Sequence, residues 1–242
     1  MTARESKERD PDFARAWAVA AEIPGWLTPA QGVALWQGAR GLHAGAHIVE
    51  IGSHRGRSTV VLGLAARQVG ARITAVDPFV DGALFGGEQT RTVFEENIRR
   101  ADLGDTVTLV PEYSTRLRRR WAQPIDLLYI DGKHDYWTVT DDLLWSRQLP
   151  PGAEFFVHDC FSSVGVTSGV LRQVLMANRY VYTGRTGSLA RFRIGVPTGA
   201  DRIEAVRELP WFARNVGIKS LLRLRLRPIA RRLGHGHQYD PY

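Results

Sequence analysis

Carboxylate and imidazole side chains stand together at two places in this chain, each directly after a short apolar run. They are Asp131 with His134 and, further along the chain, His158 with Asp159. The preceding runs, 125–130 and 153–157, are short and rich in branched and aromatic residues, which is typical of buried strands. Two carboxylates and two imidazoles at the ends of neighbouring strands could hold a divalent cation and supply a general base.

A second candidate site is the turn after the apolar run 47–51, where Gly52 and Gly56 precede Ser58. A glycine-rich turn between a strand and a helix is a place where nucleotide-like cofactors bind in doubly wound sheets. The spacing matches neither the dinucleotide fingerprint nor a P-loop. Glu50 would repel a pyrophosphate, but it suits a cofactor that carries an amino acid and a sulfonium.

Two further positions fit the same cofactor. Asp77 ends the second predicted strand, where an acidic residue can accept both hydroxyls of a ribose. NAD enzymes share that feature, but the combination with Glu50 and Gly52 favours S-adenosylmethionine (SAM). Tyr113 and Ser114 follow the third strand and are predicted to lie at the adenine edge.

Strand and helix patterns alternate along most of the chain. The strands are predicted at His47–Ile51, Arg72–Val76, Val107–Pro111, Ile125–Ile130, Glu154–Val157, Tyr180–Thr183 and Leu189–Ile194. The helices are predicted at 12–22, 28–40, Ser58–Val69, Gln89–Ala101, Tyr113–Trp121, Tyr136–Trp145 and Val164–Ala177. This alternation predicts an α/β fold, a mostly parallel sheet with helices on both faces.

The chain is expected to form one structural domain with three parts. These are an N-terminal helical cap over 1–45, a Rossmann-like catalytic core over 46–196 and a basic C-terminal extension over 197–242. The stretch Ile218–Arg227 could form an amphipathic helix or an edge strand.

Composition places the chain among ordinary globular proteins. It has 242 residues, of which 44% are hydrophobic and 24% are charged. Cys160 is the single cysteine, so an internal disulfide is excluded and a reducing compartment fits. The N-terminus lacks an apolar signal core, and no apolar run is long enough to span a membrane. The cytoplasm is the expected location.

The chain is strongly basic, with a formal net charge of +7 that is almost entirely due to arginine. The densest clusters are Arg116–Arg120 and Arg214–Arg232. Such a charge raises the prospect of nucleic acid, anionic glycans or a membrane surface as partners. A solvated arginine-rich surface is the equal alternative.

An ordered set of motifs resembles a known family. The motifs are Pro24–Thr28, Val49–Thr59, Val76–Pro78, Ile130–Tyr136, Leu149–Gly152 and Val157–Asp159. Together they resemble the class I SAM-dependent methyltransferases of the Methyltransferase-24 group, and they are similar to metal-dependent O-methyltransferases of sugars and natural products in actinobacteria. The resemblance covers roughly residues 23–195. The chain departs from the family at Lys133, where an acidic residue is common, at Ala153, where a second glycine is usual, and at His158, which is often acidic.

The resemblance implies a seven-stranded class I methyltransferase sheet and a set of site residues. SAM, with S-adenosylhomocysteine (SAH) as its product, would bind Glu50, Ile51, Gly52, Ser53, Ser58, Asp77, Tyr113, Ser114 and Asp131. His134 would act as general base beside Asp131. A Mg²⁺ ion would be held by Asp131, His158 and Asp159.

The expected function is Mg²⁺-dependent methylation of a hydroxyl on a sugar, an oligosaccharide or a glycosylated metabolite, by a homo-oligomer. A phenolic acceptor stays open because of Tyr136 and Trp137. Two alternatives belong to other functional classes. They are an RNA-binding or RNA-modifying protein and an NAD-dependent oxidoreductase. The stretch Asp131–His134 is not the Asn/Asp-Pro-Pro-Tyr type of motif that base N-methyltransferases usually carry, and the glycine spacing opposes NAD. No nucleic-acid partner is expected.

Overall fold

The computed structural model describes residues 10–81 and 86–232. Within that part the chain divides into two compact units, unit 1 up to Leu127 and unit 2 from Leu128. The strand order is β3-β2-β1-β4-β5-β7-β6 in a seven-stranded sheet. The predicted α/β fold with a mostly parallel sheet is therefore confirmed.

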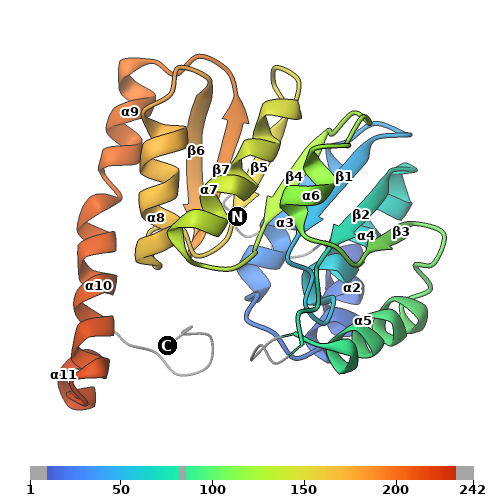
Figure 1. Ribbon diagram of the computed structural model, residues 1–242, viewed down its shortest axis with the longest axis horizontal. Coiled ribbons are helices and arrows are strands. Elements are labelled where there is room, and N and C mark those ends of the chain that lie inside the picture. Colours follow the sequence, from blue (N-terminus) through green and yellow to red (C-terminus); the bar gives the residue numbers. More distant parts are fainter. Residues whose placement is uncertain (1–9, 82–85, 233–242) are drawn as a thin grey trace. The chain divides into compact units, whose positions relative to one another are not determined.

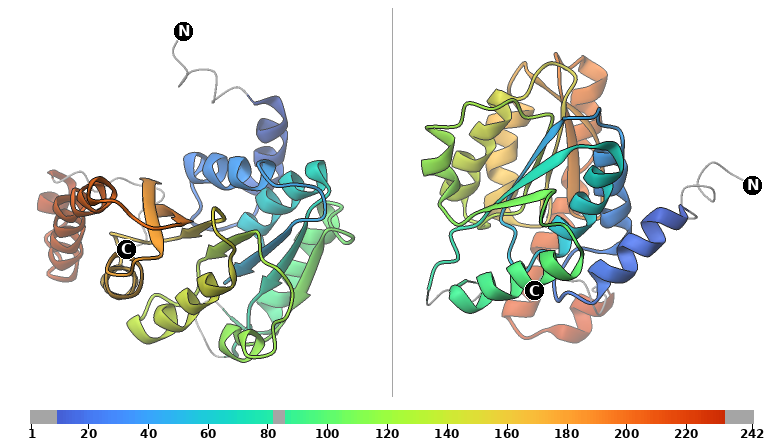
Figure 2. Two further views of the ribbon diagram at one scale, coloured as in Figure 1. Left: turned by 90° about the horizontal axis from the view of Figure 1, so that it is seen from above. Right: turned by 90° about the vertical axis from the view of Figure 1, so that its right-hand side faces the viewer.

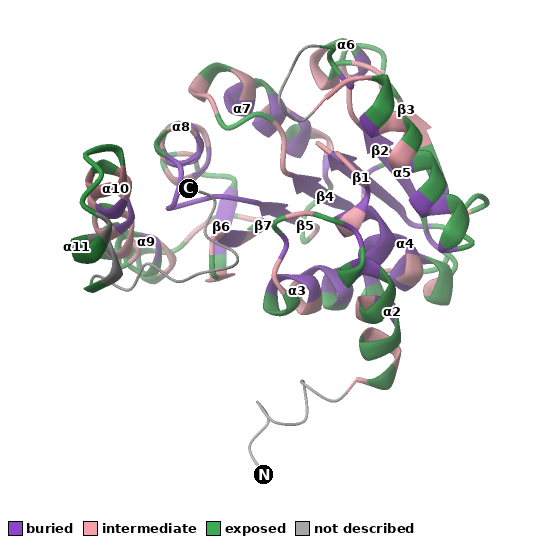
Figure 3. Ribbon diagram, turned by 90° about the horizontal axis from the view of Figure 1, so that it is seen from below, coloured by how far each residue is buried: buried purple, intermediate pink, exposed green. Residues whose placement is uncertain are grey.

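In unit 1 the strands are β1 (His47–Ile51), β2 (Arg72–Val76) and β3 (Val107–Val110). They pair in parallel, with His47 opposite Arg72 and Ile73 opposite Val107. All of β1 is buried, and Figure 3 draws buried residues in purple. Parallel strands covered on both faces read as continuous apolar runs, which is why the sequence pattern marks them clearly.

The helices of unit 1 are α2 (Pro11–Ala21), α3 (Pro29–Arg40), α4 (Arg57–Val69), α5 (Glu88–Arg100) and α6 (Ser114–Arg118). Thr28 caps α3 in a capping box with Gln31. Asp10 caps α2, so this helix begins at Pro11, one residue before the predicted range 12–22. Both helices, blue in Figure 2, pack against α4. The N-terminal helices are therefore part of unit 1.

The strands of unit 2 are β5 (Glu154–Val157), β6 (Tyr180–Thr186) and β7 (Leu189–Ile194). The strand β4 (Leu127–Ile130) begins at the last residue of unit 1, and its other residues belong to unit 2. β7 pairs antiparallel with both β5 and β6. The hairpin of β6 and β7 is the antiparallel part of the sheet (Figure 1).

Two predicted helices of unit 2 change their winding part-way. α7 (Tyr136–Leu143) continues as a 3₁₀ helix, η1 (Leu144–Gln148), and α8 (Val164–Val170) continues as a π-helix, η2 (Leu171–Leu175). α7 and α8 pack so closely that a Cβ on Gly169 would lie 2.8 Å from Val139.

The C-terminal extension is helical over its described part. It contains α9 (Gly199–Val206), α10 (Leu209–Arg223) and α11 (Arg227–Arg232). Of the two alternatives for Ile218–Arg227, the helix is correct up to Arg223, and no edge strand forms there. α9 lies beside β6 (Figure 1). The ends of the predicted cap and extension, 1–9 and 233–242, lie outside the described residues. No described helix is long and apolar enough to cross a membrane.

Candidate active site

The turn between β1 and α4 has backbone conformations that glycine adopts readily. Gly52 has a φ of +85° and Gly56 a φ of +88°. The Gly52 amide donates to the Val76 carbonyl oxygen at 2.8 Å, which ties the turn to the end of β2. A Cβ on Gly56 would lie 3.1 Å from the Phe94 ring. The shape of the turn therefore depends on both glycines.

The side chain of Glu50, on β1, stabilises the same turn through hydrogen bonds. Its side chain is fully buried, and its two carboxylate oxygens accept hydrogen bonds from the hydroxyls of Ser58 and Thr59, each at 2.5 Å. Both hydroxyls belong to the first turn of α4, so the carboxylate fixes the start of that helix on β1. The structure thus brings Glu50 and Ser58, two predicted cofactor-binding residues, into direct contact.

Ser53 is the polar residue of this turn that has unused hydrogen-bonding capacity. It is 2% exposed, and its Oγ has no hydrogen-bond partner among the described residues. Leaving a buried hydroxyl unpaired costs about 1–3 kcal/mol, which a polar ligand at this place would recover. α4 also begins without a side-chain cap, so its first amides add partial positive charge. The charged methionine end of SAM fits such a turn.

Asp77 binds the backbone of the turn and of the segment that follows β2. One carboxylate oxygen accepts from the His54 amide and the other from the Phe79 amide, both at 2.9 Å. Burial raises the pKa of Asp77 above its usual range, against the lowering effect of these hydrogen bonds. An ionised carboxylate has about four acceptor positions, so these backbone amides leave room for a ribose hydroxyl.

The two predicted adenine-edge residues lie at the start of α6. Tyr113 is 47% exposed, and its ring lies 5.5 Å from the Arg116 guanidinium carbon. Ser114 is the first residue of α6. Ile51 is buried at the end of β1. An exposed phenol ring directly after β3 is compatible with stacking on a base.

In unit 2 the ends of β4 and β5 bring the predicted catalytic residues together. The His158 amide donates to the Ile130 carbonyl oxygen at 2.9 Å, so the two strand ends lie side by side. Asp131 leaves the end of β4, and Asp159 follows His158 at the end of β5. The set Asp131, His134, His158 and Asp159 is called the His–Asp cluster below.

Each carboxylate of the His–Asp cluster faces both imidazoles. His158 Nδ1 lies 3.3 Å from Asp131 Oδ1 and 3.6 Å from Asp159 Oδ2. His134 Nδ1 lies 3.2 Å from Asp159 Oδ2, and His134 Nε2 lies 3.6 Å from Asp131 Oδ1. The side chain of His134 is 44% exposed, whereas that of His158 is 5% exposed. His134 is therefore the imidazole that an acceptor can reach.

The cluster shifts the pKa of each of its members. Burial lowers the pKa of His158, but the charges of Asp131 and Asp159 outweigh burial and raise it well above its ordinary value. His134 shows the same balance, and its pKa is raised. Burial raises the pKa of the Asp131 and Asp159 carboxyl groups, but the imidazoles have the larger, lowering effect. The pKa of each carboxyl group is therefore below its ordinary value, and both groups stay ionised.

Two further side chains support the carboxylates. The Tyr129 hydroxyl donates to Asp131 Oδ2 at 2.9 Å, and the Ser162 hydroxyl donates to Asp159 Oδ1 at 3.0 Å. Neither was predicted from the sequence. Tyr129 stands two residues before Asp131, and strand residues at that spacing point to the same face, so the spacing contained a usable signal.

The predicted metal ligands belong to the His–Asp cluster. Mg²⁺ takes oxygen ligands, and the carboxylates of Asp131 and Asp159 offer them, although both carboxylates also face imidazoles. Within the described residues, no group of three or more His, Cys, Asp or Glu side chains is arranged to hold a metal ion. Asp131, His158 and Asp159 therefore lie together, and their role toward Mg²⁺ stays a prediction.

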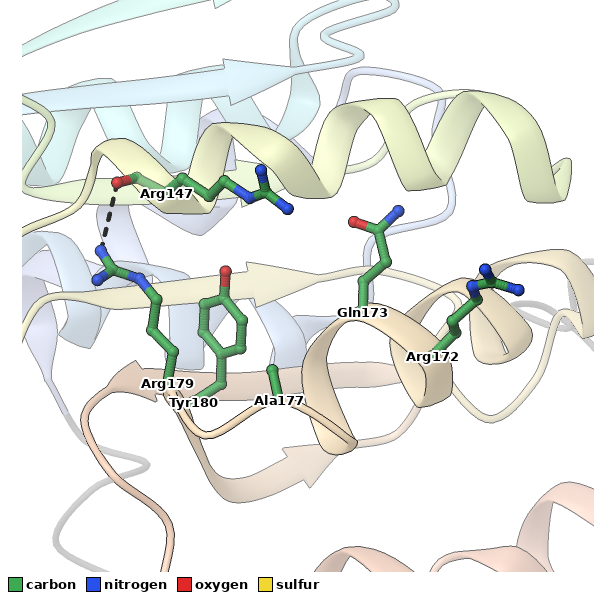
Figure 4. A pocket seen from close by; sticks show the side chains of 6 residues that line it. All are labelled: Arg147, Arg172, Gln173, Ala177, Arg179 and Tyr180. Atoms are coloured by element: carbon green, nitrogen blue, oxygen red, sulfur yellow. Dashed lines mark hydrogen bonds between the residues drawn. The ribbon is translucent and has the colours of Figure 1, made fainter.

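Unit 2 also contains a basic pocket of about 530 Å³ (Figure 4). It is lined by Arg147, Arg172, Gln173, Ala177, Arg179 and Tyr180, none of which has a carboxylate. The guanidinium of Arg179 donates to the carbonyl oxygens of Arg147 and Leu149, so it also caps the end of η1. Part of the arginine excess is therefore structural.

Comparison with known proteins identifies the chain. Residues 49–160 match the family model Methyltransf_24, described as a methyltransferase domain. This part of the chain is a methyltransferase domain. The matched range includes the turn between β1 and α4 and ends one residue after the His–Asp cluster. The prediction of a methyltransferase is therefore confirmed.

Solved structures resemble the methyltransferase in fold. Cofactor-bound Rv0187 from MTB is 21% identical, with a TM-score of 0.56 over 76% of this chain and 90% of that one. SAH-bound PaMTH1 from Podospora anserina is 13% identical, with a TM-score of 0.58 over 76% and 87%. The SAM complex of the O-methyltransferase TomG from Streptomyces achromogenes is 17% identical, with a TM-score of 0.54 over 77% and 91%.

Proposed function

We propose that the methyltransferase transfers a methyl group from SAM to a hydroxyl of a sugar or a glycosylated metabolite, with His134 as the base. The observation that carries this proposal is an exposed imidazole held between two ionised carboxylates. The similar enzyme TomG is an O-methyltransferase involved in tomaymycin synthesis, which supports a small-molecule hydroxyl as the acceptor.

We further propose that SAM binds at the turn between β1 and α4 in unit 1. When bound, SAM supplies an electrophilic methyl group on a sulfonium. Ser53 and the first amides of α4 would hold its charged methionine end, and Asp77 would hold its ribose. Glu50 keeps the turn in shape through Ser58 and Thr59. These residues bind and orient, which lowers the entropic barrier of the transfer.

His134 removes the hydroxyl proton while the acceptor oxygen bonds to the methyl carbon and the carbon–sulfur bond breaks. The electron pair of that bond goes to sulfur, and the proton stays on the imidazole. Nδ1 of His134 lies nearer to a carboxylate than Nε2 does, so Nδ1 carries the hydrogen and Nε2 accepts the proton. Asp131 and Asp159 stabilise the imidazolium that forms.

The test has two arms. Titration calorimetry with SAM and with NAD identifies the cofactor, and a chain that binds NAD but not SAM would refute the proposal. Tritiated methyl transfer from SAM to a pooled panel of sugars, glycosides and phenols identifies the acceptor class. His134→Gln should lower the rate by about 10²–10⁴-fold and leave SAM affinity unchanged.

The finer proposal of Mg²⁺ dependence rests on the two carboxylates and the family resemblance. EDTA should abolish transfer, and added Mg²⁺ should restore it, if the cation displaces the His158 imidazole from its place between them. Full activity in EDTA would show that the His–Asp cluster works without a metal. Sedimentation of the purified protein tests the predicted homo-oligomer.

A phenolic acceptor is the second candidate, and it is favoured by the aromatic residues after the His–Asp cluster. Trp137 is 77% exposed at the start of α7, and its ring lies 5.1 Å from that of Tyr136. Exposed aromatic faces suit stacking on a planar ring. Labelled phenols and unlabelled sugars in the panel would identify this alternative.

A further inference from the structure

The loop after β5 that carries Asp159 has an unusual backbone. Asp159 has a φ of +53° and Phe161 a φ of +58°. Residues with a Cβ rarely adopt the left-handed region, and a bulky residue such as phenylalanine does so only where its surroundings impose it. Asp159 is 3% exposed and Phe161 fully buried, so the packed interior has to supply that constraint.

Two side chains hold Phe161 in this conformation. The Phe161 amide donates to the hydroxyl oxygen of Thr167 at 2.9 Å, and the Phe161 carbonyl oxygen accepts from Asn215 Nδ2 at 3.0 Å. Thr167 belongs to α8, which follows the loop directly. Asn215 belongs to α10, 54 residues further along the chain, and is 5% exposed.

α10 is itself anchored to the sheet of unit 2. The Glu208 carboxylate, directly before the helix, accepts from the Tyr182 hydroxyl at 2.8 Å and from Arg185 Nε at 2.6 Å. The Arg185 guanidinium carbon also lies 3.9 Å from the ring centroid of Trp211. β6 therefore fixes the start of α10, and the helix brings Asn215 to the loop about two turns later.

The next turn of α10 also faces this region. Lys219 stands four residues after Asn215, on the same face of the helix, and it is half-buried. Burial lowers the pKa of Lys219, and the charge of Asp159 opposes that lowering. The ammonium therefore lies close enough to Asp159 for an electrostatic interaction.

We propose that Asn215 is a positioning residue for methyl transfer. Its amide fixes the left-handed Asp159–Phe161 loop, so that Asp159 keeps the imidazoles of His134 and His158 in their reactive arrangement. The described part of the basic C-terminal extension is then a component of the active site. This inference rests on the proposed role of the His–Asp cluster.

The test compares Asn215→Asp with Tyr180→Phe. Asn215→Asp keeps the shape of the side chain and removes the donor, and Asn215→Ala serves if that variant does not fold. Tyr180→Phe keeps the ring and removes a buried hydrogen bond with Ser146 in the same unit, which involves neither the loop nor α10. The rate of tritiated methyl transfer from SAM to the pooled panel, the KM for SAM and the melting temperature are measured for each.

We expect an Asn215 variant to lower the maximal rate about 10-fold with the KM for SAM unchanged. Tyr180→Phe should keep the rate, even if its melting temperature falls by as much as that of the Asn215 variant. Crystals of the Asn215 variant should show Asp159 outside the left-handed region. Equal rates for the two variants and the unaltered protein would overturn the proposal.

Asp159→Asn separates this inference from the proposed function. If that variant transfers methyl groups at the normal rate, the His–Asp cluster is not the catalytic site and the proposed function fails. If it is impaired, adding Asn215→Ala to it should change the residual rate less than twofold, because both act through one side chain. A further 10-fold loss would mean that Asn215 acts independently of Asp159, and the positioning role fails alone.

Discussion

Each unit of the methyltransferase has two fully or partly buried carboxylates near strand ends, but the partners of these carboxylates differ. In unit 1, Glu50 accepts from hydroxyls and Asp77 from backbone amides, which do not titrate near neutral pH. In unit 2, Asp131 and Asp159 face imidazoles, which do. Carboxylates in the first environment fix a shape, whereas those in the second can support movement of a proton.

The buried histidines show the same contrast. His47 is 2% exposed in unit 1, and burial lowers its pKa to about 4. His158 is buried to a similar extent in unit 2, and two carboxylates raise its pKa. Burial therefore does not decide the charge of a buried imidazole, because neighbouring charges can outweigh the lost hydration.

The largest expected effect is at Asp131. Asp131→Asn keeps the side-chain shape but removes one of the two charges that balance the imidazoles of the cluster. We expect the methyl-transfer rate to fall by about 10³-fold or more, as for the loss of a catalytic electrostatic contact. The rate is measured with saturating SAM. A loss below 10-fold would contradict the assignment of proton transfer to unit 2.

Glu50→Gln tests the shaping role of unit 1. The amide nitrogen of glutamine replaces one of the two oxygens that accept from Ser58 and Thr59, so the start of α4 loses one of its two acceptors. We expect a loss of about 2–3 kcal/mol in the free energy of unfolding, together with weaker SAM binding. Chemical denaturation and titration calorimetry measure the two effects. A normal SAM affinity with reduced stability would limit Glu50 to a role in folding.

The pH dependence of stability sharpens the comparison of the two histidines. His47 has a folded pKa of about 4, below the unfolded value near 6.5, so its neutral form stabilises the fold above that unfolded value. This contribution, roughly 3 kcal/mol, is lost as the pH falls from about 6.5 to 4. His47→Gln should flatten the acid side of the stability profile measured by urea denaturation.

His158 should behave in the opposite sense. Its folded pKa is raised, so its stabilising contribution is complete below about pH 6.5 and is lost as the pH rises through the folded value. His158→Gln should therefore flatten the alkaline side of the profile and leave the acid side unchanged. Parallel profiles for the two variants would remove the contrast between the units.

Asp77→Asn has the smallest expected effect. The amide side chain of this variant can still accept from one backbone amide through its oxygen, but its nitrogen cannot accept from the other or from a ribose hydroxyl. We expect the dissociation constant for SAM to rise about 10-fold, with little change in the maximal rate. Asp102→Asn, which alters an exposed carboxylate of unit 1, is a matched control.

Much of the fold was predictable because its signals are local. The buried strands appear as apolar runs, and the start of α3 is marked by Thr28 and Pro29. α9 was missed, although Thr198 and Asp201 form a capping box at its start. The change of α8 into a π-helix has no comparable local signal, since it depends on packing.

Residue order alone shows which chemical groups follow each strand. Asp131 and His134 follow one strand and His158 and Asp159 follow another, which is enough to predict a shared site. The partner of each carboxylate, in contrast, follows from the folded arrangement. Strand pairing brings His158 to Asp131, and α10 brings Asn215 to Phe161 across 54 residues. Such contacts depend on packing through space, which residue spacing along the chain does not encode.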